Sequence, residues 1–194
     1  MKRLTYLGVA AAASLSAAVA LVAQDVQEAS APSPEALARM APGPMHAKLE
    51  PLIGNWKLDG KWRMTPDAPW TEFEATVERE WILGGRFVQE TVASEFLGEP
   101  FEAIGVFGYD NTREEFTSLW LENMSTAIMT STGTLKGNTL TFEGVNANAM
   151  TGEKDCWSKS VVDLGNRDRQ TYKGFGKDAN GVEFQNLEMI AVRE

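Results

Sequence analysis

The chain has 194 residues, of which 43% are hydrophobic and 23% are charged, as in an ordinary soluble globular protein. Its 27 acidic residues outnumber its 18 basic ones, so the formal net charge is −9 at pH 7. A surface of that sign repels phosphate backbones and anionic lipid headgroups, which argues against nucleic-acid binding and against membrane-surface binding outside a local patch. We therefore expect one domain with a single core and no nucleic-acid partner.

The basic start Met1-Lys2-Arg3 is followed by an Ala-, Val- and Leu-rich run from Leu4 to Ala23 that ends in small residues. This order is typical of a secretory signal peptide, so we expect residues 1–23 to be removed and the body to be exported, to the periplasm or the extracellular space. The alternative is an uncleaved N-terminal anchor, because about 20 apolar residues can just span a bilayer. After cleavage we expect no stable membrane insertion.

Residues 24–44 are predicted to form a flexible linker that contains a short helix. Ser33-Pro34-Glu35 supplies a capping hydroxyl, a proline in the first turn and an acid near the positive end of the helix. Pro42-Gly43-Pro44 ends that helix. Met45, Leu49 and Ile53 then recur at a spacing of four, which predicts a second short helix that caps the following domain.

Alternating residues dominate the chain from Trp56 onward. Between Trp56 and Met64, apolar residues and glycine alternate with charged ones, and residues 72–81 repeat the pattern with glutamates on the polar face. This is the period of a strand with one buried and one solvated face. Similar runs follow at 86–97, 101–109, 115–124, 126–135, 138–145, 155–164, 169–176 and 182–192.

Short turns separate these runs, and the double glycine Gly84-Gly85 joins the second to the third. Neighbouring strands should therefore pair antiparallel, and the two glycines should supply φ > 0. A single up-and-down sheet of about ten strands curls and closes. We predict an all-β fold for residues 45–194: an antiparallel up-and-down barrel of about ten strands with short N-terminal capping helices. A barrel of this size can hold a ligand cavity.

One cysteine and one histidine limit the metal and cofactor chemistry open to the chain. Cys156 alone can form neither an intrachain disulfide nor a thiolate metal cluster. His46 precedes the strands, which disfavours a haem bound by a strand histidine and a catalytic histidine pair within the barrel. A metal site built only from carboxylates would need a cluster of acidic residues, and the sequence shows no such motif. The sequence therefore predicts no metal and no cofactor.

Several motifs resemble known barrels. Gly54-x-Trp56 resembles the start of lipocalins and calycins, in which the tryptophan packs across the closed end. The ordered series that follows resembles a bacterial, often exported, calycin-like family of unknown function. Its motifs are Trp81-Ile82-Leu83-Gly84-Gly85-Arg86-Phe87, Pro100-Phe101-Glu102, Phe107-Gly108-Tyr109-Asp110, Trp120-Leu121-Glu122-Asn123, Thr132-Gly133-Thr134, Asp178-x-x-Gly181 and Glu188-Met189, ending at Arg193.

The resemblance covers about residues 45 to 194 and implies a calycin- or lipocalin-like barrel without assigning an activity. The family usually has Asp where this chain has Glu122. It also usually has an acidic residue just ahead of an aromatic near Tyr172, where this chain reads Gln170-Thr171. If those carboxylates contact a ligand in the family, the ligand preference of this chain differs.

Arg79 is the most informative charged residue, because it lies in phase with the apolar residues Val77 and Trp81 and so points toward the core. An unpaired guanidinium there would be destabilising, so a carboxylate or water should meet it. The candidate carboxylates are Glu90, Glu122 and Glu188. Two interpretations stay open: a buried ion pair stacked on Trp56, or an anchor for the polar or anionic head of a ligand. Arg86 and Arg193 are alternatives for either role.

We predict a barrel that binds a small hydrophobic or amphipathic molecule in an aromatic-lined cavity. The expected ligand-binding residues are Arg79, Trp81, Arg86, Glu90, Trp120, Glu122, Tyr172 and Glu188. No catalytic residue is assigned. One alternative is an envelope protein-interaction module whose barrel is filled by side chains. The other is a weak acid/base enzyme in which Glu122 and Glu188 face one cavity.

Overall fold

The computed structural model describes residues 31–194, so the predicted signal peptide and the first part of the predicted linker lie outside the described residues. Helix α2 (Pro34–Met40) begins where the sequence predicts, and the Ala36 amide donates a hydrogen bond of 3.2 Å to the Ser33 hydroxyl. Among residues 31–194, no helix combines the length and the apolar character that crossing a membrane requires.

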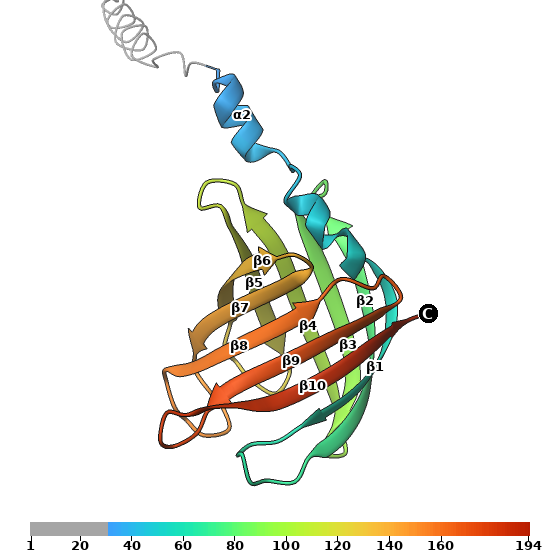
Figure 1. Cartoon of the computed structure of the whole chain (residues 1–194), viewed down its shortest axis with the longest axis vertical. Helices are drawn as coiled ribbons and strands as arrows, with labels where there is room; N and C mark the ends of the chain where they lie inside the picture. Colours follow the sequence, from blue (N-terminus) through green and yellow to red (C-terminus); the bar gives the residue numbers. More distant parts are fainter. Residues whose placement is uncertain (1–30) are drawn as a thin grey trace, which may run out of the picture. The chain divides into compact units, whose positions relative to one another are not determined.

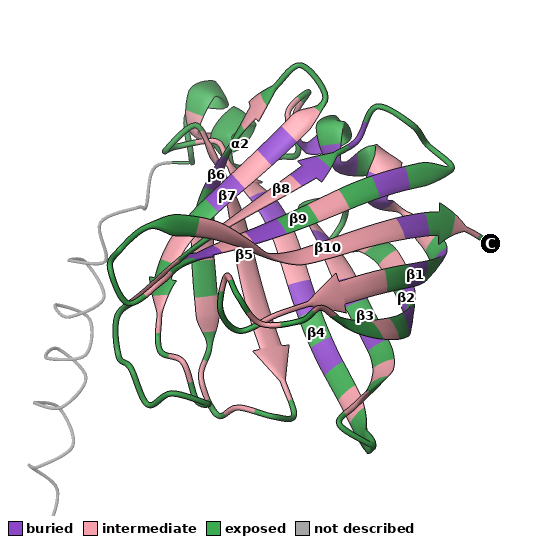
Figure 2. Cartoon of the chain, turned by 60° about the horizontal axis from the view of Figure 1, so that its bottom comes forward, coloured by how far each residue is buried: buried purple, intermediate pink, exposed green. Residues whose placement is uncertain are grey.

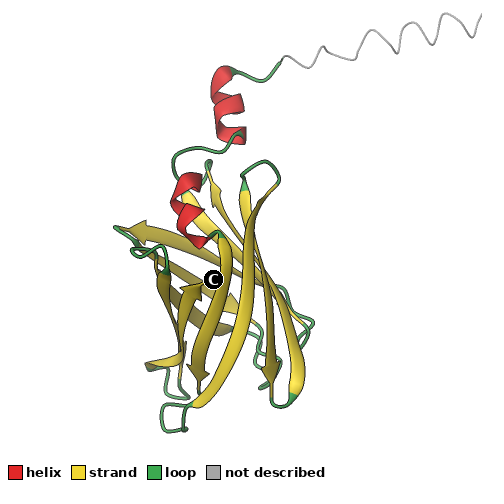
Figure 3. Ribbon diagram, turned by 90° about the vertical axis from the view of Figure 1, so that its right-hand side faces the viewer, coloured by secondary structure: helices red, strands yellow, loops and turns green. Residues whose placement is uncertain are grey.

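The second predicted helix is present as the 3-10 helix η1 (His46–Leu52). Pro51 lies inside it and has no amide proton to donate, which disfavours a regular α-helical ladder at that point. Its apolar face buries Leu49 and Leu52, and it packs against strands β3 and β4 at one end of the barrel (Figure 3). We call this the capped end.

Ten antiparallel strands form a closed barrel in which each strand pairs with its neighbours in sequence, and the last strand pairs with the first (Figure 1). The strands are β1 (Gly54–Trp62), β2 (Thr71–Ile82), β3 (Phe87–Phe96), β4 (Glu99–Asp110), β5 (Glu115–Glu122), β6 (Met129–Lys136), β7 (Thr139–Asn146), β8 (Cys156–Asp163), β9 (Arg169–Lys177) and β10 (Glu183–Arg193). The predicted all-β, ten-stranded up-and-down barrel is confirmed.

The turn between β2 and β3 uses its glycines as predicted. Gly84 has φ 68° and Gly85 has φ 80°, a region that residues with a Cβ enter only with strain. Leu83 is also left-handed, with φ 50°. The double glycine therefore sets the register of this hairpin, in which Ile82 pairs with Phe87.

Alternation decides which side chains enter the barrel. On β1, Trp56 and Leu58 are buried, whereas Lys57 and Asp59 between them are exposed. Figure 2 shows the same rule as buried bands across the strands, with most of the connecting loop residues exposed. Residues that pair across neighbouring strands share a face, so the inner face can be followed around the whole barrel.

The inner face is filled differently at its two ends. The capped end holds a buried cluster, formed by Leu49, Leu52, Val88, Phe116, Leu140, Phe142, Val162 and Leu164. The opposite end is bounded by five loops, which we call the rim: residues 63–70, 97–98, 123–128, 147–155 and 178–182. Inner-face side chains in the rim half stay partly exposed; they include Trp62, Phe73, Phe101, Trp120, Glu122, Met129, Leu187 and Met189.

Candidate functional site inside the barrel

Arg79 and Glu90 form a buried ion pair on the inner face. They are directly opposite each other in the β2–β3 register, and Nε of Arg79 lies 2.5 Å from Oε2 of Glu90. Their side chains are only 11% and 7% exposed. The expectation that a carboxylate meets Arg79 is confirmed, and among the three candidates it is Glu90. The pair is electrically neutral as a unit.

The Trp56 indole lies beside two guanidinium groups. Cζ of Arg79 is 5.7 Å from its ring centroid and Cζ of Arg193 is 4.3 Å from it, both within cation–π range. Arg193 also donates hydrogen bonds to the carbonyls of Ile53 and Pro51, so it holds the capped end together. Nη1 of Arg79 is buried and has no hydrogen-bond partner among residues 31–194. Of the two arginines beside Trp56, Arg79 is therefore the one whose guanidinium keeps a buried donor without a hydrogen bond to the described residues.

Gly105 makes room for the Glu90 carboxylate. It pairs with Glu90 across β3 and β4, and a Cβ added to it would lie 2.9 Å from Oε1 of Glu90 and 3.5 Å from the Trp120 ring. Trp120 is next along this inner row, and its indole Nε1 donates a 2.9 Å hydrogen bond to Oε2 of Glu122. An aromatic ring therefore continues the row of the ion pair around the barrel, and an acidic group lies next to it on the rim side.

Tyr172 lies on the inner face of β9, where it pairs with Met189 and Val162. Burial raises the pKa of its phenol, and the negative charge of Glu90 raises this pKa further. The nearby Ser160 hydroxyl and the charge of Arg79 act in the opposite direction and lower this pKa. The phenol is therefore neutral at physiological pH, and it shares one electrostatic environment with the Arg79–Glu90 pair.

Three of the eight predicted site residues lie away from this group. Trp81 is on the inner face, but its Nε1 donates a 2.8 Å hydrogen bond to Glu50 of η1, and its ring packs on the capped-end cluster. Arg86 is exposed in the β2–β3 turn, where it donates to the carbonyls of Met40 and Leu83. Trp81 thus links η1 to the barrel, and Arg86 links the residues that precede η1 to it.

Glu188 lies on the outer face, 3.5 Å from Lys61, so the expectation that it faces one cavity with Glu122 is wrong. A β-bulge between Gln185 and Leu187 is the cause. The extra residue shifts the alternation of β10 by one, which turns Leu187 inward and Glu188 outward. Glu122 and Glu188 therefore cannot act together on a substrate inside the barrel.

Two depressions lie on the outside of the barrel rather than at this group. One has a volume of about 480 Å³ between β1, β2 and β10 and includes Lys61 and Glu188; the other, of about 210 Å³, lies beside it along β1 and β2. Neither is lined by Arg79, Trp120 or Tyr172. Residues 31–194 contain no group of three His, Cys, Asp or Glu side chains placed to hold a metal ion.

The structure adds Gly105 and Ser160 to the residues that the sequence singled out. Gly105 had a readable signal, because a glycine at an inward position of an apolar strand indicates a close approach by another group. The Arg79–Glu90 pairing was also readable, since a hairpin centred on Gly84-Gly85 places these two residues opposite each other. Ser160 had no local signal, because its meeting with Tyr172 depends on how β8 and β9 pair.

Among solved structures, the crystal structure of Rv2717c from M. tuberculosis has a similar fold. The TM-score is 0.56 at 15% sequence identity, and the alignment covers 79% of this chain and 99% of that chain. At this identity the likeness shows the fold alone. No curated protein sequence matches the chain significantly. A family model described as "Protein of unknown function (DUF1579)" matches residues 41–193, so the chain belongs to that family.

Proposed function

We propose that this protein is an exported, calycin-like barrel that binds a small hydrophobic or amphipathic molecule within its rim half. The observation that carries the proposal is the partial exposure of inner-face aromatic and aliphatic side chains between the rim and the Arg79–Glu90 pair. Side chains such as Trp120 and Leu187 point into the barrel yet keep accessible surface. Apolar surface that faces inward without being buried is what an apolar ligand would cover.

Aromatic rings from β1, β3 and β4 lie on one side of the entrance to this region. The ring centroids of Trp62 and Phe96 are 5.2 Å apart, and those of Phe96 and Phe101 are 6.4 Å apart. Leu187 lies opposite Trp62, and Met189 and Trp120 lie further from the rim. Rings offer large contact areas at a small loss of side-chain entropy, so this lining suits an apolar body.

The polar groups favour a ligand whose head is polar but uncharged. Glu90 already neutralises Arg79, so a carboxylate or phosphate bound beside them would leave a net negative charge in a poorly solvated site. Glu122, which accepts a hydrogen bond from the Trp120 indole, would repel an anionic head as well. An alcohol, ketone or amide can instead exchange hydrogen bonds with Tyr172 and Ser160.

Native mass spectrometry of protein purified from the exported fraction tests the proposal directly. We expect a bound species of a few hundred daltons that is released on unfolding, and a mature chain that begins near residue 24. An intact Met1 in membrane fractions would contradict the export part of the proposal, whether or not a ligand is found.

Titration with the neutral apolar dye Nile red supplies the matched test of where the ligand binds. Leu187→Trp enlarges an inner-face side chain, whereas Ile190→Trp makes a similar enlargement on the outer face of the same strand. We expect dye affinity to fall at least about tenfold in the first variant and to stay unchanged in the second. Circular dichroism confirms that both variants are folded. Equal affinity in two folded variants would contradict binding inside the barrel.

A further inference from the structure

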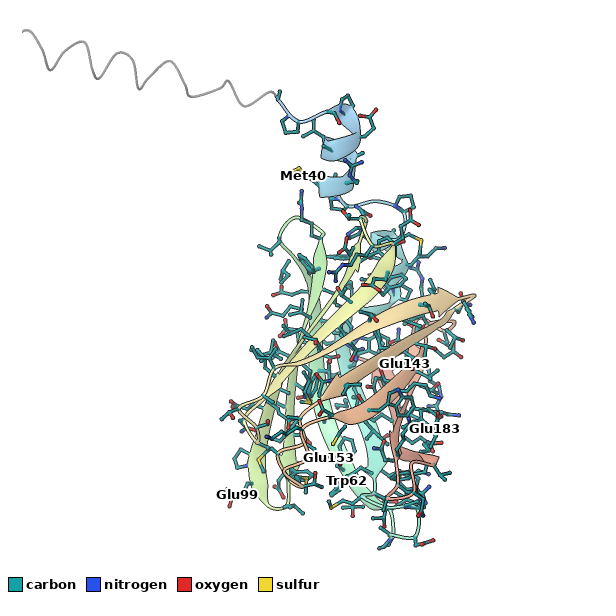
Figure 4. The ribbon with its side chains drawn as sticks, turned by 90° about the vertical axis from the view of Figure 1, so that its left-hand side faces the viewer. Met40, Trp62, Glu99, Glu143, Glu153 and Glu183 are labelled. Atoms are coloured by element: carbon teal, nitrogen blue, oxygen red, sulfur yellow. The ribbon has the colours of Figure 1, made fainter. Side chains whose placement is uncertain are left out.

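Each of the five rim loops presents an exposed apolar side chain. These side chains, which we call the apolar tips, are between 46% and 74% exposed: Met64, Leu97, Met124, Ile128, Met150 and Val182. They come one or two from each loop, so they surround the end of the barrel. Figure 4 shows Trp62, Glu99 and Glu153 at this lower end, far from Met40 at the capped end.

The four turns at the capped end differ sharply from the rim. They span residues 83–86, 111–114, 137–138 and 164–168, and among them only Leu83 is a large exposed apolar residue. Polar residues and glycine fill most of the other positions. Scattered apolar residues are normal on protein surfaces, but a set that occupies every loop at one end and one turn at the other is not scattered.

The rim loops satisfy their own backbones with polar side chains. Oδ1 of the Asn148 side chain accepts from the Met150 amide at 2.9 Å, and Oδ1 of Asp178 accepts from the Val182 amide at 2.8 Å. Leu97 has φ 54° and is followed by Gly98 with φ 85°, which closes a tight hairpin. Leu97, Met150 and Val182 are therefore presented by folded loops, and their exposed side chains remain available to another surface.

The arrangement of the tips favours a lipid surface over a protein partner. A protein interface of ordinary strength is organised around a contiguous buried apolar centre. Here the tips are divided among five separate loops around a mouth, with polar residues between them. A lipid headgroup layer is soft and can receive several separate side chains at once. Trp70 belongs to the first rim loop, and Nζ of Lys61 and Cζ of Arg63 lie 5.2 and 4.5 Å from its ring centroid. Tryptophan is typical of membrane interfaces.

The charge of the rim narrows the kind of lipid. The five loops contain four acidic residues and two basic ones, namely Asp67, Glu153, Asp155, Asp178, Arg63 and Lys154. A net negative rim is repelled by anionic headgroups and tolerates zwitterionic ones. We propose that the apolar tips dock the rim onto bilayers whose headgroups are electrically neutral. This docking does not depend on whether the barrel holds a ligand.

Hydrogen exchange with and without phosphatidylcholine vesicles tests the docking loop by loop. We expect the vesicles to slow amide exchange in the five rim loops and to leave the four capped-end turns unchanged. Vesicles that also contain phosphatidylglycerol should protect the rim less. Rim loops that exchange equally fast with and without either vesicle would overturn the proposal, and the apolar tips would then be assigned to a protein partner.

A pair of matched triple variants tests the tips themselves by vesicle flotation. The rim variant carries Leu97→Asn, Met124→Ser and Met150→Ser. The control carries Leu83→Asn, Ile104→Thr and Val192→Thr, which are exposed apolar residues elsewhere on the barrel, and Leu83 is left-handed with φ 50°, as Leu97 is. We expect binding to phosphatidylcholine to fall at least about tenfold in the rim variant only. Both triple variants keep the same N-terminal segment, so any membrane binding by that segment is the same in the two. Equal flotation of the two variants would therefore overturn the proposal.

Discussion

Val88, Leu140 and Phe142 are buried on the inner face at the capped end, whereas Trp62, Phe101 and Met129 lie on the same face near the rim and remain partly exposed. The strands are continuous and the alternation is the same in both halves. What differs is the covering: η1 closes one end with Leu49 and Leu52, and only loops bound the other. We infer that the capped end supplies most of the stability of the barrel, so the side chains of the rim half can change their contacts without unfolding it.

The largest effect is expected at the ion pair between the two halves. Arg79→Met strands the buried Glu90 carboxylate, so the free energy of unfolding should fall by about 3–5 kcal/mol. The matched control is Lys61→Met, which breaks the outer-face pair with Glu188 and should change stability by about 1 kcal/mol or less. Urea unfolding measures both.

A double-mutant cycle with Glu90→Gln isolates the interaction between the buried partners. We expect the loss in the double variant to be clearly smaller than the sum of the two single losses. Additive losses would mean that Arg79 and Glu90 act independently, and would return Glu122 to consideration as the partner of Arg79.

Truncation of one inner-face residue in each half tests whether the capped end is packed more tightly than the rim half. Leu140→Ala removes a fully buried side chain from the capped-end cluster and should destabilise the protein by about 2–5 kcal/mol. Met129→Ala removes a partly exposed side chain in the rim half, so the loss should stay below about 1 kcal/mol. Similar losses in thermal or urea unfolding would show that the two halves are packed alike.

Gly105→Ala probes the space that the Glu90 carboxylate occupies. The added methyl group would lie 2.9 Å from Oε1 of Glu90, so we expect a loss of about 1–3 kcal/mol from displaced side chains. Gly43→Ala is the control, because nothing lies within 4 Å of a Cβ at that position. If the two variants melt at the same temperature, the close approach at Gly105 is unimportant.

The smallest effect is a pH dependence at the capped end. His46 is buried beside Tyr109, and its Nδ1 accepts the Gly43 amide proton. Burial first, and the charge of Arg86 second, lower the pKa of His46 below its ordinary value of 6.5. The unfolded chain therefore binds the proton more readily, and the contribution to stability is fully present above pH 6.5 and decreases as the pH falls through the folded pKa.

His46→Gln removes the titrating group and should flatten this part of the stability curve. Urea midpoints measured at steps from neutral to mildly acidic pH make the comparison with the parent protein. An identical slope in both proteins would show that other groups, and not His46, govern the acid side.

The sequence predicted the barrel well because its signals are local. Alternation along each strand and glycine-rich turns decide which residues face inward and which strands are neighbours, and the hairpin at Gly84-Gly85 even sets the Arg79–Glu90 register. The site was predicted less well for two physical reasons. A bulge in β10 has no clear sequence mark, yet it moves Glu188 to the outside. The roles of Trp81 and Arg86 depend on where η1 and its preceding residues settle, which strand periodicity does not encode.

Closure of the barrel has a consequence for the order in which the chain folds. Trp56 pairs with Arg193, and Arg193 in turn binds the carbonyl oxygens of Pro51 and Ile53, about one full domain length away in sequence. The hairpins from β1 to β9 can form as they emerge, but β1 keeps an unpaired edge until β10 arrives. Contacts between such distant segments form slowly. The chain therefore stays incompletely folded until β10 pairs with β1. During that time the unpaired edge of β1 can pair with other chains.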